Sequence, residues 1–346
     1  GEFTRRAFLN DKLDLAQAEA VADLIEASTD AAARSAIRSL SGEFSRAVLG
    51  LVEQLISLRL LVEGTLDFPE EEINFLQQGD VAGQLGGLIA AIDRLLSGAR
   101  QGSLLRNGLH VVLAGRPNSG KSSLFNALAG YAAAIVTSQP GTTRDLIREQ
   151  INIDGLPLHV VDTAGLRSTL DPVEQEGVAR TRAQLGVADL ALLVIDASED
   201  TSDLAGIAGL LGEIPAGIPV LVVRNKIDLS GEPPGTAPES LGGHRVLRVS
   251  ALTGAGLDEL RLAIKTLAGF SDPGEGTVIA RQRHLDTLQR AQAHFAAGCR
   301  VLEERQAGEL FAEELLQVQN ALAEITGEFG SDDLLGKIFA SFCIGK

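Results

Sequence analysis

The stretch Gly115-Arg116-Pro117-Asn118-Ser119-Gly120-Lys121-Ser122 directly follows the apolar run at residues 110–114 and predicts a phosphate-binding loop between a strand and a helix. A nucleoside triphosphate carries several negative charges, and glycines at both ends of the loop allow backbone N–H groups to wrap them. Lys121 can then reach the β and γ phosphates, and the Ser122 hydroxyl can bind Mg²⁺. The helix expected over about residues 121–129 would direct its N-terminus at the phosphates. The stretch therefore favours nucleotide binding over an ordinary glycine-rich turn.

The composition limits the class of protein to which this chain can belong. Its 346 residues are enough for two or three domains with a substantial core, and 45% of them are hydrophobic, which indicates a globular protein. Lys and Arg number 30 against 46 Asp and Glu, which gives a formal net charge of −16. This charge argues against non-specific adhesion to nucleic acid or to an anionic membrane, so an RNA partner would need a local basic patch.

The cysteines and the apolar runs indicate the compartment. Cys299 and Cys343 are the two cysteines and form no CxxC pair, which is typical of a reducing environment. The apolar runs are too short to span a bilayer, so we expect a soluble, cytoplasmic protein without a membrane partner. The sequence contains no Met, and we interpret it as a fragment of a longer protein.

Apolar residues in the first third of the chain recur at helical spacing. They predict a long helix over about residues 31–64 with one buried face, an earlier helix over about 13–27 and a third over about 81–101. The inner side of the earlier helix is expected to carry Val21, Leu24 and Ile25. The buried face of the long helix is expected to consist of Ile37, Leu40, Phe44, Val48, Leu51, Leu55, Leu58 and Val62.

The middle of the chain follows a different pattern. Short β-rich runs alternate with helical patterns, which predicts an α/β domain with a largely parallel sheet. In such sheets ligands bind at the carboxyl ends of the strands, where the phosphate loop is expected to lie. Strands are expected at residues 110–114, 148–153, 158–161, 190–196, 220–224 and 246–250, and helices at 122–128, 173–187, 204–211 and 257–267.

From residue 278 the pattern is helical again, with apolar faces over 285–302 and 315–325. Neither helical flank resembles a complete bundle by itself. We therefore expect residues 1–105 and 271–346 to form one discontinuous helical domain, into which an α/β domain of residues 106–270 is inserted.

Four further motifs follow the phosphate loop in the order that a guanine-nucleotide domain requires. The motif at 141–145 offers Thr143 as a second Mg²⁺ ligand beside Ser122, and the motif at 162–165 begins with Asp162, which would hold Mg²⁺ through water. The motif at 225–228 decides guanine over adenine, because Asp228 can accept hydrogen bonds from guanine N1–H and the exocyclic amine. Residues 250–252 would close the base pocket.

Together the five motifs predict a P-loop GTPase domain of the Ras-like type that binds GTP and Mg²⁺ and hydrolyses GTP. The residues predicted to bind GTP are Asn118, Ser119, Gly120, Lys121, Ser122, Ser123, Thr137, Thr142, Thr143, Asp162, Thr163, Ala164, Gly165, Asn225, Lys226, Asp228, Ser250, Ala251 and Leu252.

The position after Gly165 departs from the usual GTPase pattern. Ras-like GTPases orient the attacking water with a glutamine there, whereas this chain has Leu166, whose alkyl side chain cannot do so. Another residue must orient the water, and the following segment offers Asp171, Glu174 and Glu176. Asn118 could hold a monovalent cation beside the β and γ phosphates in place of an arginine finger, or it could simply stabilise the loop.

The opening residues 1–15, the string 115–126, the motif 141–145 and the ending 342–346 together resemble the MnmE (TrmE) family of tRNA modification GTPases over the length of the chain. The resemblance implies a homodimeric, potassium-activated GTPase that acts with the FAD-dependent subunit MnmG in a heterotetramer on tRNA. There the family modifies carbon 5 of the wobble uridine (U34) by adding a carboxymethylaminomethyl or aminomethyl type of group. It also implies a folate-binding N-terminal domain, which this fragment lacks.

The resemblance assigns further residues. The K⁺ contacts fall on Asn118, Thr137, Gln139 and Thr142, where Gln139 replaces the Ile expected in the family and would act through its backbone carbonyl. Catalytic roles fall on Glu174, which would orient the water, and on Cys343, which would act near the modification site. Contacts to formyl-tetrahydrofolate fall on Lys12 and Lys346.

Several alternatives remain at this point. Cys343 could be a buried packing thiol, and the residues after it fit a prenylation signal poorly. The chain could be a regulatory GTPase of ribosome assembly, like Era or Der, which share the first three motifs but add a KH or second GTPase domain that this sequence does not offer. A dimerising membrane-remodelling GTPase would need a lipid-binding patch, which the acidic charge disfavours.

Overall fold

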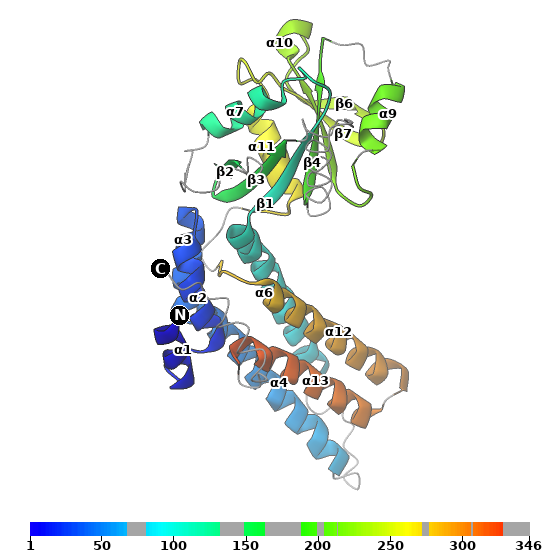
Figure 1. Ribbon diagram of the computed structural model, residues 1–346. Coiled ribbons are helices and arrows are strands. Elements are labelled where there is room, and N and C mark those ends of the chain that lie inside the picture. The colour runs from blue at the N-terminus through cyan, green and yellow to red at the C-terminus, as the bar shows by residue number, and fades with distance from the viewer. Residues whose placement is uncertain are drawn as a thin grey trace, which may run out of the picture. The chain divides into compact units, whose positions relative to one another are not determined.

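A computed structural model describes residues 1–67, 81–131, 149–162, 188–198, 204–212, 214–271, 277–305 and 307–327. The chain divides into two compact units, each with its own core (Figure 1). The helical unit comprises Gly1–Arg106 and Pro273–Lys346, and the α/β unit comprises Asn107–Asp272. These limits fall beside the boundaries expected at 105/106 and 270/271. The predicted fold class, a GTPase-like α/β domain inserted into a discontinuous helical domain, is confirmed.

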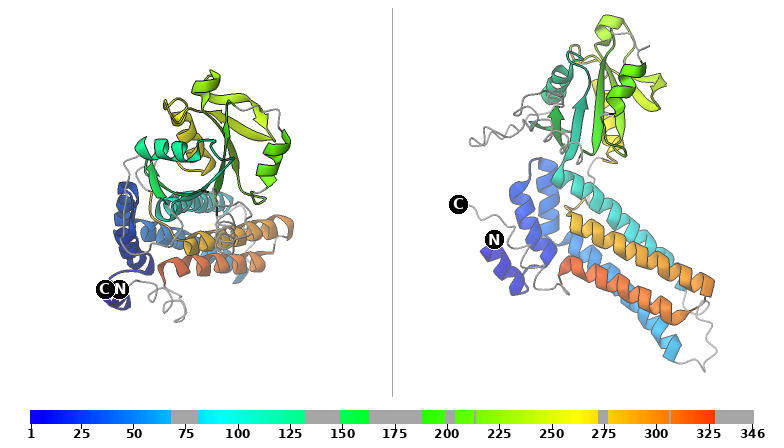
Figure 2. Two further views of the ribbon diagram at one scale, coloured as in Figure 1. Left: turned by 45° about the horizontal axis from the view of Figure 1, so that its top comes forward. Right: turned by 45° about the vertical axis from the view of Figure 1, so that its right-hand side comes forward.

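The helical unit combines helices from both ends of the chain. Its long helices lie side by side in both views of Figure 2, where the first part of the chain supplies two of them and the last part the other two. They bury an apolar core that includes Phe44, Leu88 and Phe311. The helices are α1 (Glu2–Leu9), α2 (Leu15–Glu26), α3 (Asp30–Leu40), α4 (Glu43–Asp67), α6 (Val81–Asn107), α12 (Gln282–Arg305) and α13 (Gly308–Thr326).

The single long helix expected over about residues 31–64 is wrong. The chain breaks there into α3 and α4, because Gly42 adopts φ +83°, a left-handed conformation that ends a helix. As a consequence Ile37 does not join the buried stripe, and 53% of it is exposed. The six positions from Phe44 to Val62 on that stripe are buried as expected.

Of the expected inner face of α2, Val21 and Leu24 are half-buried, but the prediction is wrong for Ile25. Ile25 is 80% exposed, whereas Glu19 and Asp23 are buried. Helix α2 begins at a capping box, in which Asp14 and Gln17 exchange side chain to backbone hydrogen bonds, and this fixes which face turns inward. Two carboxylates on that face are stable only if other parts of the fold supply cations.

The α/β unit is built on a seven-stranded sheet with the order β2-β3-β1-β4-β5-β7-β6. The five central strands run parallel, and both edge strands are antiparallel to their neighbours. Edge strand β6 was not expected from the sequence, because its run contains Gly235 and Pro238. The strands are β1 (Leu109–Ala114), β2 (Glu149–Ile153), β3 (Leu156–Asp162), β4 (Leu190–Asp196), β5 (Val220–Asn225), β6 (Gly235–Leu241) and β7 (His244–Arg248).

Helices cover both faces of this sheet (Figure 1). They are α7 (Lys121–Tyr131), α9 (Leu204–Gly212), the short α10 (Ile227–Ser230) and α11 (Leu257–Leu267). The parallel order brings the carboxyl ends of β1, β4 and β5 to one edge of the sheet, which is where the predicted motifs begin. Within the described ranges no helix is both long and apolar enough to cross a membrane.

Candidate functional site

The phosphate loop joins β1 to α7, and its backbone requires glycine at both ends. Gly115 and Gly120 adopt φ +143° and +93°. A Cβ on Gly115 would lie 2.2 Å from the Val194 carbonyl oxygen, and one on Gly120 would lie 2.2 Å from Asn225 Nδ2. Side chains at these positions would therefore push the loop away from the sheet.

Lys121 is the first residue of α7 and folds back over the loop. Its Nζ donates hydrogen bonds to the carbonyl oxygens of Gly115 and Arg116, each at 3.0 Å, and the residue is 7% exposed. These partners are neutral, so a phosphate oxygen would offer Nζ a stronger hydrogen bond than either carbonyl does. The ammonium is thus held beside the loop where an anion can take over its bonds.

Asn225 connects the phosphate loop with the loop that follows β7. From the end of β5, its Nδ2 donates to the Ser119 carbonyl at 3.2 Å, and its Oδ1 accepts from the Ala251 N–H at 3.0 Å. The residue is 1% exposed, so these bonds are shielded from water. One buried amide therefore holds two of the predicted GTP-binding segments in register.

Lys226 follows Asn225 in a left-handed conformation, φ +68°. Its Nζ donates to the Asn118 carbonyl at 2.7 Å and pairs with Asp196 Oδ2 at 2.6 Å. Burial would raise the pKa of Asp196, but the hydrogen bonds from Lys226 and Ser198 lower it below its usual value. The carboxylate therefore stays charged and holds Lys226 across the phosphate loop.

Asp196 is a site residue that the sequence analysis missed. It ends β4 opposite Asn225 in the register of the parallel pair. The available signal was an acidic residue at the carboxyl end of a strand next to the one that carries Asn225 and Lys226.

The predicted guanine-binding residues lie together. Asp228 Oδ1 accepts a hydrogen bond from Ser250 Oγ at 2.5 Å, and the same Oγ accepts from the Thr253 N–H at 3.1 Å. Ser250 therefore orients the Asp228 carboxylate, which is exposed at the start of α10 and can meet a base. Leu252 is 85% exposed beside it and offers an apolar surface to a ring.

The remaining predicted ligands divide into two groups. Ser122 and Ser123 are exposed in the first turn of α7, and the backbone of Asp162 pairs with Leu113 at the end of β3. Lys12 is exposed in the helical unit, after α1. The following lie outside the described residues: Thr137, Gln139, Thr142, Thr143, Thr163, Ala164, Gly165, Leu166, Asp171, Glu174, Glu176, Cys343 and Lys346.

The uncharged side-chain oxygens of Asn118 and Ser122 suit the implied cations, K⁺ and Mg²⁺. Asn118 has an exposed side chain on a residue whose φ of +62° fixes the loop, and its amide oxygen is a ligand type suited to K⁺. The Ser122 hydroxyl at the start of α7 suits Mg²⁺.

A phosphate loop, a cation held on its carbonyls and an oriented aspartate for the base, all at the carboxyl edge of a largely parallel sheet, define a P-loop GTPase domain. The helical unit narrows the class further, because the model of the MnmE helical domain matches residues 15–343. The chain belongs to the MnmE family of tRNA modification GTPases.

Individual relatives agree with this assignment. The tRNA modification GTPase MnmE of Shewanella loihica is 53% identical over 348 residues, covering all of this chain and 76% of the relative. The MnmE of Chromobacterium violaceum is 55% identical over 346 residues and is covered to 75%. Among solved structures, Aquifex aeolicus Era bound to GDP and AlF4⁻ is 28% identical, covering 54% of this chain and 66% of that one. Its TM-score of 0.34 is too low to bear on fold or function.

Proposed function

We propose that this chain hydrolyses GTP to drive modification of carbon 5 of the tRNA wobble uridine, in the cytoplasm and together with an FAD-dependent partner subunit. The observation that carries the proposal is Asn225, which bonds the phosphate loop and the base loop at once. Phosphate binding and guanine recognition are thereby coupled through one buried side chain. Membership of the MnmE family supports tRNA as the substrate.

The described residues have defined tasks in hydrolysis. Lys121 would exchange the Gly115 and Arg116 carbonyls for β and γ phosphate oxygens. Ser122 would bind Mg²⁺ together with Thr143, and Asp228 would accept the two guanine donors. Mg²⁺ and K⁺, when bound, would supply positive charge that offsets the negative charge developing on the phosphates.

Activation by K⁺ is part of the proposal and rests on Asn118 together with Thr137, Gln139 and Thr142. We expect GTP hydrolysis to rise steeply when Na⁺ is replaced by K⁺ at constant ionic strength, and Asn118→Ala to abolish the rise. Equal rates in the two salts would refute the cation assignment. Glu174→Ala should retain nucleotide affinity but lose turnover, because Leu166 cannot orient the attacking water.

The substrate is tested in cells. Deleting the gene of the full-length protein and measuring wobble-uridine modification in cellular tRNA by mass spectrometry should show loss of the carboxymethylaminomethyl or aminomethyl type of group. Complementation with the wild-type gene should restore it, whereas the Glu174→Ala variant should not. Normal modification in the deletion strain would reject the tRNA function and favour a regulatory GTPase. Variants expressed in the same deletion strain allow tests of the proposed homodimer, the heterotetramer and the role of formyl-tetrahydrofolate at Lys12 and Lys346.

A further inference from the structure

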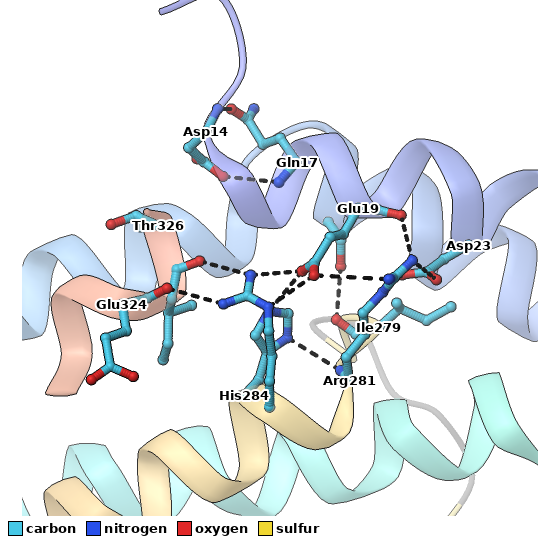
Figure 3. Close-up of polar contacts among 12 residues, drawn as sticks. Asp14, Gln17, Glu19, Asp23, Ile279, Arg281, His284, Glu324 and Thr326 are labelled. Atoms are coloured by element: carbon cyan, nitrogen blue, oxygen red, sulfur yellow. Dashed lines mark hydrogen bonds and ion pairs between the residues drawn. The ribbon is translucent and has the colours of Figure 1, made fainter. Parts of the chain in front are cut away.

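A group of charged side chains built around two buried carboxylates lies in the helical unit, outside the GTPase motifs (Figure 3). We call it the ionic cluster. Two carboxylates one turn apart on α2 meet arginines and a histidine from the two segments of chain that adjoin the α/β unit. The ionic cluster consists of Glu19, Asp23, Arg106, Arg281, Arg283 and His284.

Asp23 binds both segments through which the chain enters and leaves the α/β unit. Its Oδ1 lies 2.7 Å from Arg106 Nε and 2.7 Å from an Arg281 terminal nitrogen. Arg106 is the last residue of the helical unit before the first crossing, and Arg281 follows the second crossing at Asp272/Pro273. One carboxylate oxygen, buried to within 2% exposure, therefore joins two positions 175 residues apart in sequence.

Glu19 fixes the returning segment more firmly. Arg283 donates to both of its oxygens, from Nε at 2.8 Å and from a terminal nitrogen at 2.7 Å. The same guanidinium donates to the carbonyl oxygens of Glu324 and Ile325, near the C-terminus of α13. Helices α2, α12 and α13 are thus bonded at one point.

The described residues before α12, from Ile279 onward, are held by burial and hydrogen bonds. Ile279 and Ala280 are buried, and the Ile279 carbonyl oxygen accepts a hydrogen bond from Ser39 Oγ of α3 at 3.2 Å. The Arg281 N–H donates to His284 Nδ1 at 3.2 Å, which leaves the proton of the neutral ring on Nε2, 3.1 Å from Glu19. Burial and hydrogen bonds therefore fix the chain from Ile279 to the first turn of α12.

Packing and stability alone do not account for the ion pairs of the ionic cluster. Replacing a buried ion pair by apolar residues of similar volume is often neutral or stabilising, so such pairs are weak evidence for a role in stability alone. Their directional bonds instead fix one arrangement of the groups that they join. Here the groups joined are α2, the end of α6 and the segment that leads into α12.

We propose that the ionic cluster is a positioning device for nucleotide-driven movement: it bonds α2 to the end of α6 and to the described segment that leads into α12, which lie on either side of the α/β unit in sequence, so that a displacement of the α/β unit is passed on to α2. The device rests on the proposed GTPase function, and its residues belong to the helical unit. Arg106, Asp23 and Arg281 are accordingly positioning residues.

The test is the spread of distances between the two units. Cys299→Ser and Cys343→Ser give a background for spin labels at Glu53→Cys on α4 and Glu259→Cys on α11, both exposed. In pulsed electron paramagnetic resonance, Arg106→Gln and Arg281→Gln should each widen the distance distribution about twofold. The double variant should widen the distribution little further, because loss of either arginine already breaks the link between the two segments at Asp23. Additive effects of the two substitutions would overturn the shared role of Asp23.

A matched control uses a more exposed ion pair of the same unit that does not involve the carboxylates of α2. Arg290→Gln removes the pair between α12 and Glu324 of α13 and should leave the distribution unchanged. Equal widening by this control, or unchanged widths in the folded cluster variants, would overturn the proposal. If circular dichroism shows that Arg281→Gln does not fold, Arg106→Gln decides, since Asp23 then keeps Arg281 as its partner. Single-turnover GTP hydrolysis, measured on the same samples, shows whether a negative result contradicts the positioning role or the proposed GTPase function.

Discussion

Two cations in this molecule, the buried Lys121 and the partly buried Arg283, have opposite kinds of partner. In the phosphate loop, Lys121 donates to two neutral backbone carbonyls. In the ionic cluster, Arg283 donates to both oxygens of a buried carboxylate. Within the described residues, Arg283 has an opposite charge within hydrogen-bond distance, whereas the partners of Lys121 are carbonyl oxygens.

The difference distinguishes a site suited to binding a ligand, the phosphate loop, from one that stabilises the fold, the ionic cluster. A carbonyl partner is readily exchanged for a phosphate, because the anion offers a charge-assisted hydrogen bond and the displaced carbonyl loses only a neutral one. A carboxylate partner has no such competitor, and removing it leaves an unpaired buried cation. Substitutions in the phosphate loop should therefore change what the protein binds, whereas substitutions in the ionic cluster should change how firmly it folds.

The largest effect is expected at Lys121. Lys121→Ala should weaken GTP binding roughly a thousandfold, about 4 kcal/mol, because the only change is the loss of the cation offered to the phosphates. Thermal unfolding of the α/β unit should shift by less than about 1 kcal/mol, since the lost partners are two carbonyls that water can reach once the side chain is gone. Titration with a fluorescent GTP analogue and calorimetry measure the two quantities. A large loss of stability with intact binding would remove the contrast with Arg283.

Glu19→Gln should have the reverse profile. It leaves Arg283 without a charged partner and should lower the free energy of unfolding of the helical unit by about 3 kcal/mol, with GTP affinity unchanged. Urea unfolding followed by circular dichroism measures the change. The control is Glu324→Gln, which breaks the exposed pair with Arg290 and should cost less than about 0.5 kcal/mol. Similar losses for the two variants would contradict the distinction between the cluster and a surface ion pair.

Asp228→Asn should exchange one ligand for another. The carboxylate that Ser250 orients accepts from two guanine donors, and an amide would present a donor to the guanine amine. We expect GTP affinity to fall about a hundredfold, about 2.7 kcal/mol, and xanthosine triphosphate, which has an oxygen in place of that amine, to bind better. Competition between the two nucleotides checks this. A variant that loses both would indicate a damaged loop, and one that keeps GTP would place guanine recognition elsewhere.

The smallest expected effect is the response of the ionic cluster to acid. Burial by itself would raise the pKa of Glu19, but the hydrogen bonds from His284 and Arg283 lower it to about 2 from a usual 4.5. Its stabilisation is therefore complete above the higher value and is lost as the pH falls towards the lower one, with about 2 kcal/mol lost at pH 3. Burial lowers the pKa of His284, so protonation of the unfolded chain below pH 6.5 acts in the same direction.

Unfolding of the helical unit followed at pH 7 and pH 3 measures this loss. Glu19→Gln should reduce the acid sensitivity by about the same 2 kcal/mol. An equally steep response in that variant would assign the effect to other groups.

Much of the α/β unit could be predicted, because strand periodicity and motif spacing are local signals. Gly115 directly follows β1, Asp162 and Asn225 end β3 and β5, and Ser250 comes two residues after β7, as their sequences indicate. Strand β6 escaped prediction because its pairing with β7, and not its own composition, makes it a strand.

The ionic cluster could not be predicted for a related reason. The cations that allow Glu19 and Asp23 to be buried lie more than 80 residues away in sequence for Arg106 and more than 250 for Arg281. The sequence of α2 taken alone predicts that Ile25 turns inward, whereas Ile25 is 80% exposed. Likewise Gly42 is compatible with a continuous helix until its left-handed φ is seen.

The edge strand β6 also has a consequence for assembly. Its pairing with β7 shifts register between Thr236 and Ser240, and Pro238, within that interval, has no N–H to donate. A second copy of the chain could not extend the sheet across this edge with a regular ladder of hydrogen bonds. Regular edge-to-edge pairing through β6 is therefore disfavoured, which limits this route to aggregation at high concentration.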